Sequence, residues 1–159
     1  MFSSFAGTVG RMQTVVATDG ACVGNPGPGG WAWYIDENRW AAGGKPGTTN
    51  NQMELVAVLE VLQETGDDEL LVLCDSKYVI DALTKWRFGW KKRGWRKADG
   101  QTIANKDLFT ALDAALVGRK VTFEWVRGHN GHPLNEAADV RARASAEAIR
   151  DGRNVITGP

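Results

Sequence analysis

Cysteine, histidine and long apolar runs are all scarce in this sequence. Its 159 residues include two cysteines, Cys22 and Cys74, and two histidines. The cysteines do not have the spacing of a metal-binding motif and are too few for a disulfide framework, so we expect both thiols to be reduced. No apolar run is long enough to cross a bilayer. These absences exclude a disulfide-rich scaffold, a cysteine zinc site and a membrane-spanning helix.

The start of the chain does not look like a targeting signal. Residues 1–12, MFSSFAGTVGRM, lack the basic start and the continuous apolar segment of a secretory signal. We interpret residues 1–12 as a flexible extension, residues 13–150 as one domain and residues 151–159 as a tail. The length suits a single domain with its own core. We expect a cytoplasmic monomer that does not bind membranes.

Basic residues are concentrated in one segment. The chain has 19 Lys and Arg against 19 Asp and Glu, so its net charge is zero. Residues 84–97, TKWRFGWKKRGWRK, contain seven of the basic residues and no acid; we call them the basic segment. Cations interleaved with tryptophan are typical of contact with nucleic acid. A solvated loop is the simpler alternative. We expect Trp86 and Trp90 mainly to pack this segment onto the body.

The hydrophobic pattern predicts three strands first and alternating helices and strands afterwards. Strands are expected at 14–18, 30–35, 39–43, 69–74 and 121–125, and helices at 51–65, 77–85, 105–116 and 134–150. Thr49, Asn50 or Asn51 can cap the first helix, and Ser76 the second. This order predicts an α/β fold whose five-stranded mixed sheet has three antiparallel strands, then two parallel ones, with helices on both faces.

Two acids stand where predicted strands end. Asp19 follows the first strand and Asp75 the fourth. Ligands of open α/β sheets gather at the carboxyl ends of strands, so both carboxylates are candidates for one site. The alternative for Asp19 is a turn formed with Gly20.

Two further acids lie on predicted helices. Glu54 shares a helix face with apolar residues at 57, 58 and 61, where a solvated Glu is unusual; a capping-box acid after Asn51 is the alternative. Asp139 precedes Arg143 by one turn, and an ordinary ion pair explains it more simply. These four acids lie on four separate elements, three of them pointed toward one sheet edge, and would repel one another, so we expect a hard divalent cation, Mg²⁺ first, to bind between them.

Five ordered motifs connect the sequence to a known family. They are TDGACVGNPGPGG, TTNNQMEL, CDSKYVIDAL, WKKRGW and WVRGHNGHPLNEAADVRARA. Together they resemble the bacterial type 1 ribonucleases H over residues 13–150, nearly the whole chain. Departures are modest: Lys77 stands where Gln is common, Ala21 where Ser is common, and residues 1–12 are extra. None of these departures affects an acid.

The resemblance implies cleavage of the RNA strand of an RNA–DNA hybrid, leaving 3′-hydroxyl and 5′-phosphate ends. It assigns two Mg²⁺ ions, or Mn²⁺ in their place, to Asp19, Glu54, Asp75 and Asp139. It also assigns an assisting role in proton transfer or product release to His129, in the GHNGH loop. A zinc site at the two histidines would need a further soft ligand, which this part of the sequence does not offer. A role in DNA replication and R-loop removal would follow.

The resemblance also implies a surface for both strands of the hybrid. Cys22, Asn25, Asn51 and Gln52 match positions along its minor groove, and Thr49 and Asn50 resemble a pocket for a DNA phosphate. The basic segment resembles the family's protruding handle. The handle and its surroundings add these candidate contacts: Lys77, Trp86, Lys91, Lys92, Arg93 and Trp95. Capping and turn formation are the alternative roles for the polar residues.

Three classes of function are therefore compared. The first is a hybrid-specific ribonuclease, the second a DNA-cutting nuclease or integrase-like enzyme of the same fold, and the third a non-catalytic nucleic-acid-binding module. The basic segment and the GHNGH loop favour the first. A binding module would lack one or more of the four acids, and all four are present.

Overall fold

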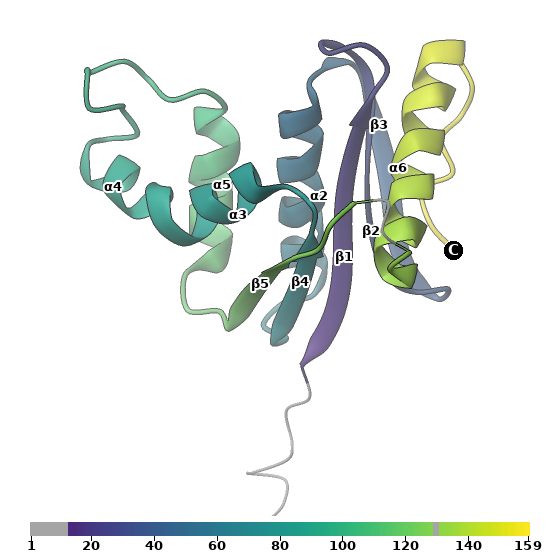
Figure 1. The fold of residues 1–159 in the computed structure, drawn as a ribbon, viewed down its shortest axis with the longest axis horizontal. Coiled ribbons are helices and arrows are strands. Elements are labelled where there is room, and N and C mark those ends of the chain that lie inside the picture. Colours follow the sequence, from purple (N-terminus) through teal and green to yellow (C-terminus); the bar gives the residue numbers. More distant parts are fainter. Residues whose placement is uncertain (1–12, 129–130) are drawn as a thin grey trace, which may run out of the picture.

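The structure is a computed structural model that describes residues 13–128 and 131–159 (Figure 1). Its strands are β1 (Thr14–Cys22), β2 (Gly27–Asp36), β3 (Arg39–Thr48), β4 (Leu70–Cys74) and β5 (Val121–Trp125). Its helices are α2 (Asn50–Glu64), α3 (Lys77–Asp81), α4 (Arg87–Lys92), α5 (Lys106–Leu116) and α6 (Pro133–Asp151), with one π-helical turn, η1 (Ala82–Trp86), between α3 and α4. None of the helices in this described part is both long enough and apolar enough to traverse a bilayer.

All five strands join one mixed sheet in the order β3-β2-β1-β4-β5. The pairs β1/β2 and β2/β3 are antiparallel, whereas β4 is parallel to both β1 and β5. The predicted sheet is therefore confirmed. The strand at 121–125 has the predicted bounds, and the others are found near their predicted positions.

Two strands run further than the sequence predicts. β1 continues past Thr18 to Cys22, because it keeps β2 as a neighbour up to the pair of Cys22 with Gly29. β3 continues past the predicted end at residue 43 to Thr48, opposite Gly27. The prediction that β1 ends before Asp19 is therefore wrong. Asp19 lies within the strand.

The predicted helix at 77–85 also continues further. The Ser76 hydroxyl caps α3 by accepting from Val79 N–H at 3.2 Å. The backbone then stays helical through η1 and α4 as far as Lys92. The basic segment therefore begins on a helix instead of forming a loop throughout, and in Figure 1 α4 lies at the opposite end of the molecule from α6.

Helices cover both faces of the sheet, as predicted. Successive side chains of a strand point to opposite faces, and β1 follows this rule. Val16 belongs to the main core with Leu55 and Val58 of α2, whereas Ala17 packs with Ala138 of α6. β1 therefore lies between α2 and α6.

Small residues bring α6 close to the sheet. A Cβ built on Gly30 of β2 would lie 2.2 Å from the Ala142 carbonyl oxygen of α6. Ala142 itself is buried beside Ala32 and Ala42. Any larger side chain at position 30 would push the helix away. This close approach sets the position of Asp139, which α6 carries.

Gly30→Ala should lower the free energy of unfolding by roughly 1–3 kcal/mol, because its methyl group overpacks the contact with α6. Urea unfolding followed by circular dichroism measures the change. Gly47→Ala is the matched control, since a Cβ there has nothing within 4 Å, and it should change stability by less than about 0.5 kcal/mol. Equal stability of the two variants would contradict this account of α6 packing.

Candidate active site

Sheet register brings Asp19 and Asp75 together. Thr18 and Cys74 are the last paired residues of the parallel strands β1 and β4, and the two acids come next on each chain. Glu54 reaches the same place from α2. Each of the three acids offers a carboxylate oxygen, and these oxygens lie within 4.8 Å of one another. We call Asp19, Glu54 and Asp75 the acid cluster.

One backbone N–H joins two members of the acid cluster. Gly20 N–H donates to Asp19 Oδ1 at 2.9 Å and to Glu54 Oε1 at 3.1 Å. A Cβ on Gly20 would lie 2.4 Å from the Glu54 nitrogen, so only glycine lets β1 and α2 approach this closely. Thr49 caps α2 by accepting from Gln52 N–H at 3.1 Å. The capping-box interpretation of Glu54 is therefore wrong.

Burial changes the acidity of this cluster. Asp19 is 3% exposed and Glu54 7%. Burial is the main cause that raises the pKa of Asp19 to about 7. Burial, followed by the nearby Asp19 charge, raises the pKa of Glu54 well above its usual value. The Cys74 thiol, which donates to Glu54 Oε2 at 4.0 Å, also has a pKa raised by burial. Without a cation, the site therefore favours protonated groups.

The donor set of the cluster fits a hard divalent cation. Carboxylate oxygens are the ligands that Mg²⁺ and Ca²⁺ prefer. Buried carboxylates with raised pKa values gain from any cation that replaces their protons. The neutral Cys74 thiol is not such a ligand. Together these observations indicate a divalent cation site.

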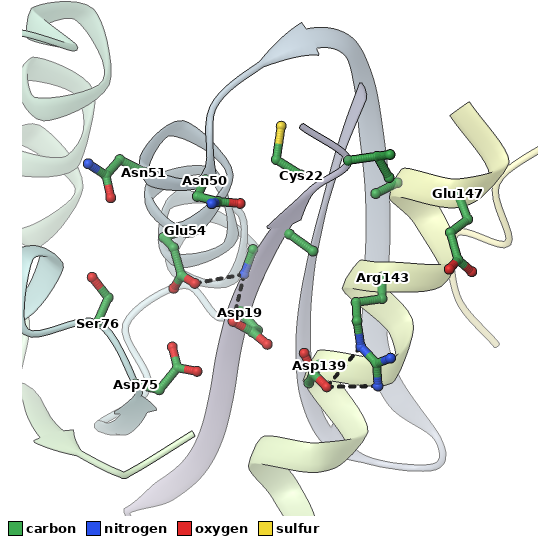
Figure 2. A pocket seen from close by; sticks show the side chains of 14 residues that line it. Asp19, Cys22, Asn50, Asn51, Glu54, Asp75, Ser76, Asp139, Arg143 and Glu147 are labelled. Carbon is green, nitrogen blue, oxygen red and sulfur yellow. Dashed lines mark hydrogen bonds and ion pairs between the residues drawn. The ribbon is translucent and has the colours of Figure 1, made fainter. Parts of the chain in front are cut away.

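Asp139 lies in the same cavity but is held by Arg143. The cavity has a volume of about 490 Å³, and its lining includes Asp139 and Arg143 as well as the whole acid cluster (Figure 2). Asp139 Oδ2 accepts from the guanidinium at 3.0 Å from Nε and 2.9 Å from Nη2. The simple ion pair is therefore present. Asp139 is not among the three acids whose oxygens meet within 4.8 Å.

Several residues predicted to contact the minor groove or a DNA phosphate lie together beside the cluster, but Gln52 does not line this cavity. Cys22, Asn50 and Asn51 line the cavity, and the Cys22 thiol lies 3.3 Å from the carbonyl oxygens of Gly27 and Thr48. Asn25 Oδ1 accepts from Asn50 N–H at 3.2 Å. The structure thus brings the segment from Cys22 to Asn25 and the start of α2 to one surface.

Gln52 lines a second cavity, which was not predicted from the sequence. It has a volume of about 510 Å³, and its lining includes Lys45, Asn105 and Lys106. Gln52 bonds Thr48 Oγ1 at 2.6 Å and Asn105 Oδ1 at 3.2 Å. Asn105 has a positive φ of 61°, which is uncommon outside glycine. The sequence predicts Asn105 as the first residue of the helix at 105–116, whereas in the structure it is the residue before α5.

An acid from outside the basic segment neutralises part of it. Asp113 of α5 pairs with Arg87 and, at 2.9 Å, with Lys91. Within the described residues, Lys92 forms no ion pair, and Arg93 Nε donates to the Arg96 carbonyl at 3.2 Å. Although the basic segment contains no acid, the fold therefore brings an acid from α5 next to it.

The tryptophans of the basic segment differ in exposure. Trp90 packs edge-on against Phe109 with ring centroids 5.1 Å apart, and Trp95 contacts the main core. Trp86 is 43% exposed although its ring lies 5.9 Å from that of Trp90. Trp90 therefore attaches the segment to α5 as expected, whereas Trp86, which was also expected mainly to pack, remains exposed. His129 lies outside the described residues.

Comparison with known proteins identifies the family. The RNase H family model matches residues 11–147. The chain belongs to the RNase H family. Ribonuclease H of Tropheryma whipplei (strain Twist) is 48% identical over 149 residues, which cover 92% of each chain. Ribonuclease HI of Caulobacter vibrioides is 47% identical over 134 residues, covering 82% of this chain and 90% of that relative. This RNase H is therefore an enzyme, a nuclease of bacterial type.

Solved structures agree with this RNase H fold. LC9-RNase H1, described as a type 1 RNase H with the type 2 active-site motif, matches with a TM-score of 0.74 and 30% identity, over 92% of this chain and 77% of that one. A foamy viral protease–reverse transcriptase in complex with an RNA/DNA hybrid matches with a TM-score of 0.71 and 15% identity, over 83% of this chain and 20% of that one. The second likeness concerns the fold alone.

The raised pKa of Asp19 predicts a pH dependence of stability. Folding favours the protonated acid, so its contribution is complete below the ordinary pKa near 4 and is lost as pH rises through about 7. In EDTA, the parent protein should therefore lose stability over this range. Over the same pH range, the free energy of unfolding of Asp19→Asn should fall by less than that of the parent. The difference should be at least about 1.4 kcal/mol, the free energy of a tenfold difference in proton affinity between the folded and unfolded chains. Urea unfolding at a series of pH values measures both, and identical profiles would contradict the assignment.

Proposed function

We propose that this RNase H hydrolyses the RNA strand of RNA–DNA hybrids, with two Mg²⁺ ions, to leave 3′-hydroxyl and 5′-phosphate ends. The observation that carries the proposal is the acid cluster, three carboxylates within 4.8 Å of one another where the parallel pairing of β1 with β4 ends. The cluster opens into a cavity lined by polar residues. Membership of the family supplies the reaction class.

The acids would hold the metal ions. Asp19, Glu54 and Asp75 of the acid cluster would be the central ligands, and Asp139 would complete the set. When bound, a pair of metal ions supplies an activated water and stabilises the leaving oxygen. Arg143 contacts Asp139 through Oδ2, so Oδ1 is the oxygen that Asp139 would offer. Mn²⁺ is a plausible substitute by the same ligand chemistry.

The polar residues beside the acid cluster would distinguish RNA from DNA. A 2′-hydroxyl both donates and accepts hydrogen bonds and is exposed in a wide minor groove. Asn51 and Gln52 at the start of α2, with Asn25 and Cys22, would contact it. Thr49 and Asn50 lie at the helix N-terminus, which favours a phosphate of the DNA strand.

The basic segment would act as a handle that contacts the phosphate backbone. Lys92 and Arg93 would contact phosphates, with Trp86 and Trp95 as rigid aromatic neighbours, whereas Lys91 is partly neutralised by Asp113. His129 would assist proton transfer or product release. We further propose a single catalytic domain over residues 13–150, flanked by an extension and a tail, that works as a cytoplasmic monomer in replication and R-loop removal.

An end-labelled substrate panel tests the proposed function. The RNA strand of the hybrid should be cut with Mg²⁺ and left intact with EDTA, while double-stranded RNA, single-stranded RNA and duplex DNA are spared. Asp75→Asn should reduce turnover by at least about a thousandfold, on the order of losing a metal-ion contribution. Asp36→Asn, an exposed acid at the β2–β3 turn, should cut normally. Cleavage of duplex DNA would instead favour the DNA-cutting relatives of the fold.

Charge removal tests the handle. Lys92→Ala with Arg93→Ala should weaken hybrid binding and flatten the slope of log K against log salt by up to about 1.8, since each lost phosphate contact contributes about 0.9. Lys91→Ala should flatten the slope less and lower stability more, because it leaves buried Asp113 with one partner fewer. Binding is measured by fluorescence anisotropy in EDTA from low to high salt. Equal slopes for parent and double variant would exclude phosphate contact.

A further inference from the structure

Trp125 links β5 to Asp75 of the acid cluster. It is the last residue of β5, and its partner across the parallel ladder is Cys74, directly before Asp75. Its indole Nε1–H donates to the Asp75 carbonyl oxygen at 3.2 Å. The Trp125 side chain therefore connects β5 to Asp75, the first residue after β4.

The chain that follows Trp125 closes over the same acid. Val126 N–H donates to the Cys74 carbonyl at 3.0 Å, which extends the ladder by one step. A Cβ on Gly128 would lie 2.8 Å from Asp75 Oδ2, so the backbone there passes beside the carboxylate. The position of Asp75 thus depends on β5 and the residues after it as well as on β4.

The Trp125 ring also holds a cation. The Lys77 ammonium lies 4.4 Å from the centroid of the indole ring, within the range of a cation–π interaction. Trp125 is 42% exposed and Lys77 is also exposed, so the charge stays at the surface. None of the ion pairs within residues 13–128 and 131–159 involves Lys77. A cation that an aromatic ring orients and no acid neutralises is available to a phosphate.

We propose that Trp125 is a positioning residue with two functions. Its N–H sets the backbone of Asp75 for metal binding, and its ring holds the Lys77 ammonium toward a backbone phosphate of the substrate. This inference rests on the proposed function, since the phosphate is that of the hybrid. The exposed Trp125 side chain would then affect both the position of Asp75 and the binding of the substrate by Lys77.

Two variants separate these functions. Trp125→Phe keeps an aromatic ring for Lys77 and removes the donor to Asp75. Lys77→Met keeps a long side chain and removes the charge. Lys120→Met is the matched control, because Lys120 is also exposed and lies just before the other end of β5. Thermal melting followed by circular dichroism first establishes that each variant is folded.

Metal binding without substrate tests the donor. Calorimetric titration with Mg²⁺ should show an affinity on the order of tenfold lower for Trp125→Phe, as expected when a group that orients a ligand is removed. Lys77→Met and Lys120→Met should not lower it. Unchanged affinity in folded Trp125→Phe would overturn the positioning of Asp75. If that variant does not fold, Trp125→Tyr, which also lacks the indole N–H, takes its place.

Hybrid binding in EDTA tests the cation. Lys77→Met should flatten the salt slope by about 0.9, the value for one phosphate contact, and Trp125→Phe and Lys120→Met should keep the parent slope. A parent slope in Lys77→Met would overturn the phosphate contact. Neither measurement needs turnover. A parent protein that binds Mg²⁺ and leaves the hybrid uncut would refute the proposed function, whereas normal cutting with unaffected variants would refute only this inference.

Discussion

The repulsion among buried carboxylates is the constraint on which this structure depends. Asp19 and Glu54 are almost fully buried and lie beside Asp75, so both have raised pKa values. The protein supplies one backbone donor, Gly20 N–H, between the first two. Protonation offsets part of the cost in the absence of metal, and a divalent cation offsets it at neutral pH. The site is thus built to favour a bound cation at the expense of the stability of the metal-free fold.

Close backbone approach holds the acids in this unfavourable arrangement. Gly20 allows α2 to meet β1, and Gly30 allows α6 to meet β2. Each contact places an acid-bearing helix against the sheet, Glu54 on one face and Asp139 on the other. Packing energy from the large core on the α2 face and the smaller alanine clusters on the α6 face opposes the repulsion. Glycine at these positions therefore serves the site as well as the fold.

Internal ion pairs divide the remaining charges into two groups. Asp113 engages Arg87 and Lys91, and Asp139 engages Arg143. These charges are satisfied within the chain, so an outside ligand must compete for them. Lys92 on the basic segment and Lys77 on the Trp125 ring are the contrasting cases, since no ion pair within the described residues includes either. Although the net charge is zero, the acid cluster is therefore suited to cations and the surfaces at Lys92 and Lys77 are suited to phosphates.

The sequence by itself determined the mixed sheet, the helices on both its faces and the candidate acids, because alternating and apolar runs report burial and the motifs are local. It did not determine that β1 and β3 continue through glycine-rich residues, since cross-strand partners decide where a strand ends. Nor could it show that Asp113 neutralises Lys91 or that Trp125 contacts Asp75. These outcomes depend on which distant residues become neighbours, and only tertiary packing decides that.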